Sequence, residues 1–247
     1  MKTIDAKGMT YKELNEKVRE VVASGEKKIK LINVNGQRYI ADAIDKPVQI
    51  IIEGVPGNDL GAFMNGPTVI VNANGQDHIA NTMNEGKIVV HGDAGDVLGY
   101  GMRGGKLFIK GDVGYRVGIH MKEYRDKVPV IVIGGRARDF FGEYMAGGII
   151  ILLGLNASNN SDSRIAGNYF ATGMHGGVIY VRGRLEDCQL GKEVAVLEPD
   201  ESDYKTIKKY VTEFAKDLGF DAGEILKSKF IKIKAVSHRP YGNLYAY

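Results

Sequence analysis

The chain has 247 residues, with 33 glycines, 6 prolines and a formal net charge of +3. Glycine is nearly twice as frequent as in an average protein, but with so little proline the chain fits neither collagen nor a disordered Pro/Gly tract. The weak charge argues against a nucleic-acid partner, and without a signal peptide or an apolar run near ~18 residues we expect a cytoplasmic protein with no membrane span.

The N-terminal part of the chain, residues 1–47, is predicted to form a cap made of a helix and a hairpin. Thr10–Glu13 make a capping-box pattern ahead of apolar residues at helical spacing. The apolar segments 29–34 and 38–41 then flank Asn35-Gly36, a pair of residues that favours a tight turn between antiparallel strands. We therefore expect a helix followed by a β-hairpin.

The middle of the chain, residues 48–190, consists of a 19-residue repeat. Its units begin at Gln49, Thr68, Lys87, Lys106, Val130, Ile149 and Val178. The second and fourth positions are aliphatic in every unit: Ile50 and Ile52, Val69 and Val71, Ile88 and Val90, Leu107 and Ile109, Ile131 and Ile133, Ile150 and Leu152, Ile179 and Val181. Six methionines fall in one further column, given insertions in two units: Met64, Met83, Met102, Met121, Met145 and Met174. A unit so regular predicts a repeat architecture.

This repeat predicts a right-handed parallel β-helix of about seven turns, in a mainly β fold with flanking N- and C-terminal helices. Alternating aliphatic positions mark a strand with one buried face, and the glycine after it permits a corner that a Cβ would obstruct. A unit this small cannot bury its own apolar face, so successive units must stack at roughly 4.8 Å and align like residues into ladders. Right-handed winding is expected because parallel crossovers are almost always right-handed.

Residues 191–247 are predicted to add a helix and a tail, within one domain that spans residues 1–247. The helix begins at Ser202 and carries an apolar stripe that must pack on an end or a flank of the coil: Tyr204, Ile207, Val211, Phe214 and Leu218. An alternating segment, residues 230–236, precedes a Tyr-rich tail that we expect to lie on a partner. The polar insertion at residues 156–164 is expected to form an exposed loop.

No residue carries a catalytic, cofactor-binding or metal-binding signature. The stretch Gly99–Gly104 matches a dinucleotide-binding fingerprint, but that mechanism needs a helix after the glycines, and here another strand follows. The methionine column is expected to fill the core. Cys188, the one cysteine, excludes an intrachain disulfide and a cysteine-only metal site. The histidines fall in different repeat columns, so stacking does not gather them into a ligand set: His78, His91, His120, His175 and His238.

One outward column has two interpretations: Asn74, Asp93, Asp112 and Arg136. Asp93 and Asp112 are expected to lie one turn of the coil apart, close enough to repel each other and to attract a cation or an arginine of a partner. The simpler interpretation is a solvated ladder that shares counter-ions with Arg136 or Arg116, because exposed ion pairs contribute little. We expect the solvated ladder and leave cation binding open.

The unit G-x-x-M-x-x-G-x-[IL]-x-[VIL]-x-G stands at Gly99–Gly111 and Gly142–Gly154, with a variant at Ala80–Gly92. With the stretches NVNGQRYIA and FIKIKAVSHRPY, it resembles the glycine-repeat (GXGXG) C-terminal domain of the large (alpha) subunit of glutamate synthase. The C subunit of formylmethanofuran dehydrogenase carries a similar repeat. The resemblance covers nearly the whole chain.

The resemblance implies a stand-alone, non-catalytic structural subunit of a glutamate synthase-type complex. Its implied partners are a glutaminase-type amidotransferase subunit and a synthase subunit that carries FMN and an iron–sulfur cluster, because this chain lacks the cysteines for either chemistry. One alternative is a scaffold subunit of a formylmethanofuran dehydrogenase-type complex. A stand-alone β-helix acyltransferase is a further alternative, but it would need a six-residue aliphatic period. A homo-oligomer stays open.

Overall fold

The computed structural model describes residues 1–157 and 164–236, so the Tyr-rich tail and most of the polar insertion lie outside the described residues. In chain order the elements are β1 (Lys2–Asp5), α1 (Tyr11–Ala23), β2 (Lys28–Asn35), β3 (Gln49–Val55), β4 (Asn65–Val71), β5 (Glu85–Val90), β6 (Lys106–Ile109), β7 (Val130–Ile133), β8 (Ala146–Leu152), β9 (Gly176–Arg182), the short 3-10 helix η1 (Asp187–Gln189), β10 (Val194–Leu197), α2 (Glu201–Leu218), α3 (Ala222–Leu226) and β11 (Phe230–Ala235). Within these residues the strands form one 11-stranded sheet.

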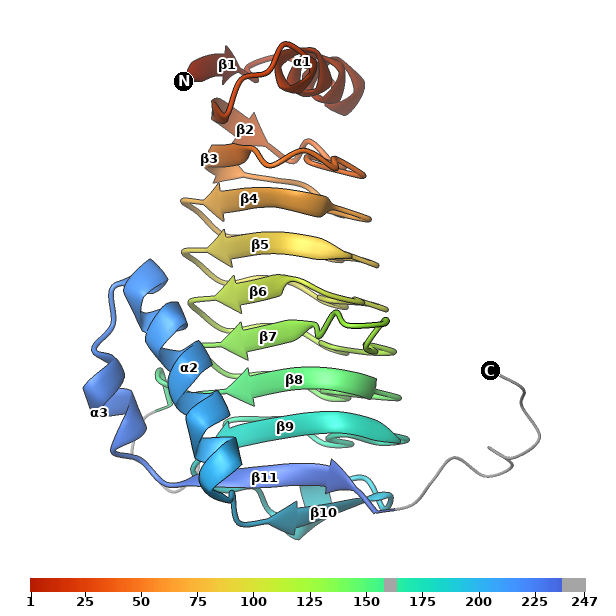
Figure 1. The fold of residues 1–247 in the computed structure, drawn as a ribbon, viewed down its shortest axis with the longest axis vertical. Helices are drawn as coiled ribbons and strands as arrows, with labels where there is room; N and C mark the ends of the chain where they lie inside the picture. The colour runs from red at the N-terminus through yellow and green to blue at the C-terminus, as the bar shows by residue number, and fades with distance from the viewer. Residues whose placement is uncertain (158–163, 237–247) are drawn as a thin grey trace, which may run out of the picture.

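Strands β1 to β9 pair in parallel, each with the next in the chain, and stack as the turns of a solenoid (Figure 1). The seven predicted unit starts pair one to one, which confirms the repeat register: Gln49, Thr68, Lys87, Lys106, Val130, Ile149 and Val178. The strands that contain these residues, β3 to β9, enclose about six turns rather than the predicted seven. The handedness stays a prediction.

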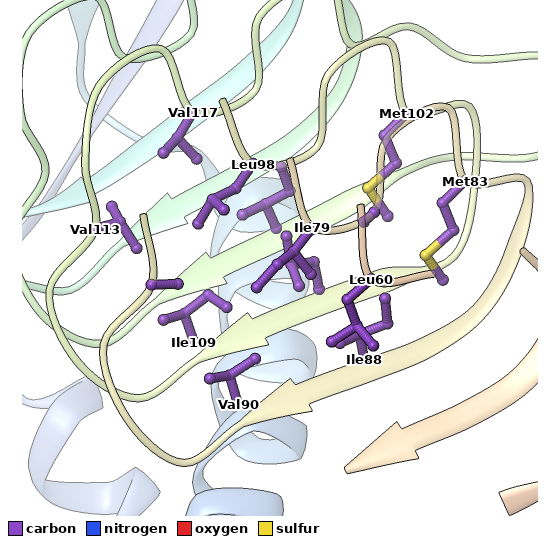
Figure 2. Close-up of a cluster of buried hydrophobic side chains, with 14 of the residues drawn as sticks. Leu60, Ile79, Met83, Ile88, Val90, Leu98, Met102, Ile109, Val113 and Val117 are labelled. Atoms are coloured by element: carbon purple, nitrogen blue, oxygen red, sulfur yellow. The ribbon is translucent and has the colours of Figure 1, made fainter. Parts of the chain in front are cut away.

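The interior of the solenoid consists of apolar ladders. All the aliphatic residues at the second and fourth repeat positions are fully buried, and so are the methionines of the Met column. In Figure 2, Met83 and Met102 lie beside a second inward column that contains Leu60, Ile79 and Leu98. Each buried side chain of this size contributes about 1.5–3 kcal/mol to stability. The methionines therefore serve as core, as expected.

Helix α1 covers the N-terminal end of the solenoid (Figure 1). It has the predicted capping box: Glu13 N donates to Thr10 Oγ1 at 3.3 Å, and Thr10 N donates to the Glu13 carboxylate at 2.7 Å. Leu14 and Val18, which share one helical face, are buried in the main apolar core of the solenoid. The helix thereby closes the end of the ladders, which would otherwise expose apolar side chains to water.

The hairpin predicted for segments 29–34 and 38–41 is wrong. Strand β2 pairs in parallel with both β1 and β3, and residues 38–41 contain no strand. Ile29 lies beside Ile50 and extends the buried column by one more coil, whose period is 21 residues because Lys28 pairs with Gln49. Burial of this coil therefore outweighs the local turn preference of Asn35-Gly36.

Helix α2 packs on the outer flank of the sheet and begins at Glu201, one residue before the prediction (Figure 1). Its buried residues form a second apolar cluster with outward side chains of β5 to β9: Ile207, Tyr210, Val211, Phe214 and Leu218 against Val89, Phe108, Val130, Val132, Ile151 and Tyr180. Tyr204, a member of the predicted stripe, is 44% exposed, whereas Tyr210 is 8% exposed and takes its place. No helix in the described part of the chain is both long and apolar enough to cross a bilayer.

At the C-terminal end of the solenoid, the sheet finishes with two antiparallel strands. The predicted segment 230–236 contains β11, which pairs antiparallel with β9 on one side and with β10 on the other. This pairing covers the last parallel strand of the solenoid, so β9 does not present a free edge.

Two groups of ion pairs hold α2 against the sheet. Lys87 Nζ lies 2.7 Å from Asp217 Oδ2, and Lys106 Nζ lies 2.7 Å from Glu213 Oε2. At the other end of the helix, the Asp203 carboxylate accepts hydrogen bonds from Tyr180 Oη and from Lys232 Nζ, both at 2.6 Å. Burial opposes ionisation of Asp203, but the bonds from Lys232 and Tyr180 outweigh burial and lower its pKa.

We predict that Asp203→Asn lowers the free energy of unfolding at pH 7 by about 2–3 kcal/mol, because Lys232 loses the nearer of its two carboxylate partners in a nearly buried site and keeps only Asp200 at 3.7 Å. Asp203 has a lowered pKa in the folded state, so its contribution is present above the ordinary value of 3.8 and is lost as pH falls below it. Urea denaturation should therefore show a wild-type advantage at pH 7 that shrinks below pH 3.8.

The matched control is Glu224→Gln, which breaks an ion pair to Lys227 on the exposed surface. This change should alter the free energy of unfolding by less than about 0.5 kcal/mol. Equal stability of Asp203→Asn and the wild type at pH 7 would contradict the assigned role of Asp203.

Candidate functional site

The predicted column Asn74, Asp93, Asp112 and Arg136 runs along one corner of the solenoid and joins successive coils. Asn74 Oδ1 accepts a hydrogen bond from Asp93 N at 3.0 Å, and Asp93 Oδ1 accepts one from Asp112 N at 2.8 Å. Asp112 Oδ1 accepts from Arg136 N at 2.7 Å. Each side chain thus satisfies a backbone N–H of the next coil, a group that is costly to leave unpaired.

A second column of the same kind lies three residues further along each coil. Asp77 Oδ1 accepts from Asp96 N and Asp96 Oδ1 accepts from Tyr115 N, both at 2.9 Å. Two coils later, Asp139 Oδ1 accepts from Asn168 N at 2.8 Å. We call the carboxylates of both columns the acidic corner: Asp77, Asp93, Asp96, Asp112 and Asp139. Sequence reasoning missed the second column, although its signal, a repeated Gly-Asp pair, is visible in Gly92–Asp96.

The acidic corner has one ion pair of the predicted kind. Arg136 Nε lies 3.7 Å from Asp112 Oδ2, as the solvated-ladder interpretation expects. Arg116, the other predicted counter-ion, instead pairs with Glu143. Across residues 1–157 and 164–236, no group of three or more His, Cys, Asp or Glu side chains is arranged to hold a metal ion. The hydrogen bonds of the corner give its carboxylates a structural role.

Glycines lie where the next coil passes over these side chains. A Cβ on any of six glycines would lie 1.8–2.2 Å from the Oδ1 atom of the Asn or Asp in the preceding coil: Gly92, Gly95, Gly111, Gly114, Gly135 and Gly167. None of these six has a positive φ, so space rather than backbone freedom requires glycine there. Two positions without glycine agree with this explanation, because Ala73 and Arg138 follow coils that have Val55 and Tyr115 in place of the Asn or Asp. Gln76 differs, since it follows Asn58, whose Oδ1 accepts a longer bond of 3.4 Å from Asp77 N.

The turn segment of each coil, between the acidic corner and the Met column, has alternate residues in the left-handed region. In one coil these are Arg116, Gly118 and His120, with φ of 59°, 75° and 56°. Arg116 N and His120 N donate to the following coil, whereas Gly118 N donates back to Leu98 O of the preceding coil at 2.8 Å. Outer residues of the triplets that have side chains point them outward and align them into columns, whereas Gly101 and Gly173 have none.

The rings among these outward residues, His120, Phe140, Tyr144 and Tyr169, lie beside two further exposed tyrosines, Tyr100 and Tyr115. We call these six residues the aromatic face. The rings of Phe140 and Tyr169 stack with centroids 4.8 Å apart, and those of His120 and Tyr144 stack at 5.4 Å. The Arg116 guanidinium lies 4.4 Å from the Phe140 centroid. The Glu143 carboxylate, which binds Arg116, belongs to a residue that is only 7% exposed. These contacts hold the aromatic face in one arrangement.

The remaining predicted candidates do not meet in a site. Gly99–Gly104 lies in a turn segment with no helix after it, as expected. His91 lines a shallow pocket beside Lys87 and Asp217, and its pKa is lowered mainly by burial and then by Lys110, against an opposing effect of Asp217. Cys188 is exposed. His238 lies outside the described residues.

The sequence held a signal for the aromatic face that the repeat alignment did not use. His120 and Tyr144 each precede a methionine of the Met column, and Phe140 and Tyr169 each precede a buried Phe. Residues next to inward columns point outward, so these pairs had to stack. The left-handed backbone that presents them cannot be inferred from spacing, because bulky residues seldom adopt it.

Comparisons with known proteins agree with this geometry. A family model described as GXGXG motif matches residues 12–236. An uncharacterized protein of Methanocaldococcus jannaschii is 55% identical over 248 residues, which cover 98% of this chain and 95% of that protein. A chain in the crystal structure of the formyltransferase/hydrolase complex FhcABCD from Methylorubrum extorquens, in complex with methylofuran, has a TM-score of 0.66 at 18% identity, with 95% of this chain and 91% of that chain covered. At this identity the likeness shows the fold.

We predict that Gly95→Ala lowers the free energy of unfolding by about 1–3 kcal/mol, because overpacking a close contact forces the neighbouring coil to shift. Its Cβ would lie 2.0 Å from Asp77 Oδ1. Asp77→Ala removes one hydrogen bond and should cost about 1 kcal/mol.

The double variant Gly95→Ala/Asp77→Ala is the control, because it removes the carboxylate that the new Cβ meets. It should lose less stability than the sum of the two single changes when measured by urea denaturation. Strict additivity would show that the glycine is not there to make room for Asp77.

Proposed function

The chain belongs to the GXGXG motif family, and on this basis we propose that it is a non-catalytic structural subunit of a multi-protein complex. The aromatic face carries this proposal. Four of its tyrosines remain 41–56% exposed although stacking orders the face. Ordered aromatic surface is typical of binding sites, because Tyr contributes contact area at a low entropy cost.

The architecture suits a scaffold. Neighbouring coils are tied by backbone bonds in the strands and in the turn segments, and the coils that carry the acidic corner are joined through its carboxylates as well. A solenoid of this kind presents fixed positions along its length, so subunits docked on it keep a constant separation. The fold likeness to a chain of a multi-subunit complex supports the same role.

The repeat and its flanking stretches favour glutamate synthase-type partners. These are a glutaminase-type amidotransferase subunit and a synthase subunit with FMN and an iron–sulfur cluster. In such a complex the cofactors belong to the partners, and this chain fixes the relative positions of the two active sites. The unit at Gly99–Gly111, repeated at Gly142–Gly154, supports this assignment.

A second candidate is a formylmethanofuran dehydrogenase-type complex. The similarity to a chain of the formyltransferase/hydrolase complex, over 95% of this chain, favours it. The structural role would be the same in this complex, but the partners would act on formyl groups.

The test is co-expression with each set of partner subunits encoded in the source genome. We expect one set to form a complex with this chain, with a mass by light scattering well above 27.0 kDa. If the glutamate synthase-type set assembles, glutamine-dependent glutamate formation should require all three chains. Elution of this chain at 27.0 kDa with every set would count against a subunit role.

A further inference from the structure

We infer that the aromatic face and the acidic corner form one docking surface for a different protein subunit whose contacting surface is rich in lysine and arginine. The inference rests on the proposed function and adds where the partner binds and what chemistry it presents. The two parts are adjacent along each coil, because Asp139 precedes Phe140, and Tyr115 lies in the same column as Asp96 and Asp139.

The apolar part of this surface consists of exposed tyrosines around stacked rings. Tyr169 is 56% exposed, Tyr115 and Tyr144 are each 46% exposed, and Tyr100 is 41% exposed. Tyr144 and Tyr169 stack on His120 and Phe140, and Tyr100 packs edge-on against His120, so a partner would not need to order these rings on binding. Contiguous exposed aromatic surface of this kind is a feature of protein interfaces.

The charged part is negative. The acidic corner has five carboxylates, and the guanidinium groups near it are those of Arg136, Arg138 and Arg116, of which Arg116 is paired with Glu143. Among ion pairs within the described residues, only Asp112 of these five has a cationic partner. The whole chain has a formal net charge of +3, so the negative charge is local to this corner. A surface that carries lysine and arginine would complement it.

The charge also decides against a second copy of this chain as the occupant. A two-fold dimer through this surface would place one acidic corner against another, which is unfavourable. A copy that docked through a basic surface elsewhere would make a heterologous contact, and such contacts extend into open arrays unless they close as a ring. A nucleic acid would be repelled by the same carboxylates. A distinct basic protein fits both parts of the surface.

Asn74 shows which substitution would remove the negative charge of the acidic corner without removing its hydrogen bonds. Asn74 makes the same bond to the next coil as Asp93 does, with Oδ1 3.0 Å from Asp93 N. The triple change Asp77→Asn/Asp96→Asn/Asp139→Asn should therefore keep the coil bonds and lose three charges. The apolar part is tested separately with Tyr144→Ala/Tyr169→Ala, and circular dichroism and urea denaturation check that both variants fold.

Two matched controls lie off the surface. Tyr204→Ala removes an aromatic ring of similar exposure, 44%, from α2. The triple change Glu16→Gln/Glu201→Gln/Glu224→Gln removes three exposed carboxylates from the helices. Both controls should bind the partner within about twofold of the wild type, since exposed residues outside an interface contribute little.

The measurement is the dissociation constant for the purified partner subunit, taken from the complex that assembles on co-expression, at low and at high salt. We expect the Asn variant to bind about tenfold more weakly at low salt and to lose most of the salt dependence. The Tyr variant should bind at least about tenfold more weakly at both salt concentrations.

Wild-type affinity of both variants would overturn the docking surface and leave the subunit role intact, because the complex would still form. If no partner set assembles, the proposed function and the docking surface fail together. If light scattering shows that the wild-type chain self-associates and the Tyr variant does not, the occupant is a second copy and the inference is wrong.

Discussion

The structure depends on one constraint: coils stack in register at a single strand spacing, so each residue must suit the residue directly beneath it. The seven aligned units satisfy this with ladders of aliphatic side chains, and the Met column fills the space between them. The same constraint explains polar features. An Asp whose carboxylate accepts a hydrogen bond from the next coil fills the space that a Cβ of that coil would need. The residue of the next coil that faces it is therefore glycine, as Gly95 is for Asp77.

The constraint also determines the outer surface. Because like positions superpose, an aromatic residue that recurs in one column must meet its counterpart, as Phe140 meets Tyr169. Carboxylates in a column gather in the same way into the acidic corner. A stacked fold therefore concentrates surface chemistry along its length without any dedicated loop, and an interaction surface can arise from the repeat that builds the core.

The repeat made much of the fold predictable, because ladders require periodicity that a sequence displays directly. Strands β3 to β9 all pair in the predicted register. The first coil was missed because its period is two residues longer, and the local preference of Asn35-Gly36 was then taken as a hairpin. Glycine was assigned to corners, but at Gly95 it leaves room for a carboxylate of another coil, a long-range contact. The stacking of Phe140 on Tyr169 could have been inferred, because each precedes a buried Phe, but the left-handed backbone that presents them leaves no mark in spacing.

Because both ends of the solenoid are capped, its length is set by the number of coils between the caps. Helix α1 closes one end and β11 with β10 covers the other, while strands β3 to β9 between them pair in one parallel register (Figure 1). Because this strand register is shared, duplicating one 19-residue unit would move the two ends apart by a single increment of about 4.8 Å. The number of coils thus sets the distance between the two ends of the solenoid in steps of one strand spacing, and related proteins can set a different distance by having a different number of coils.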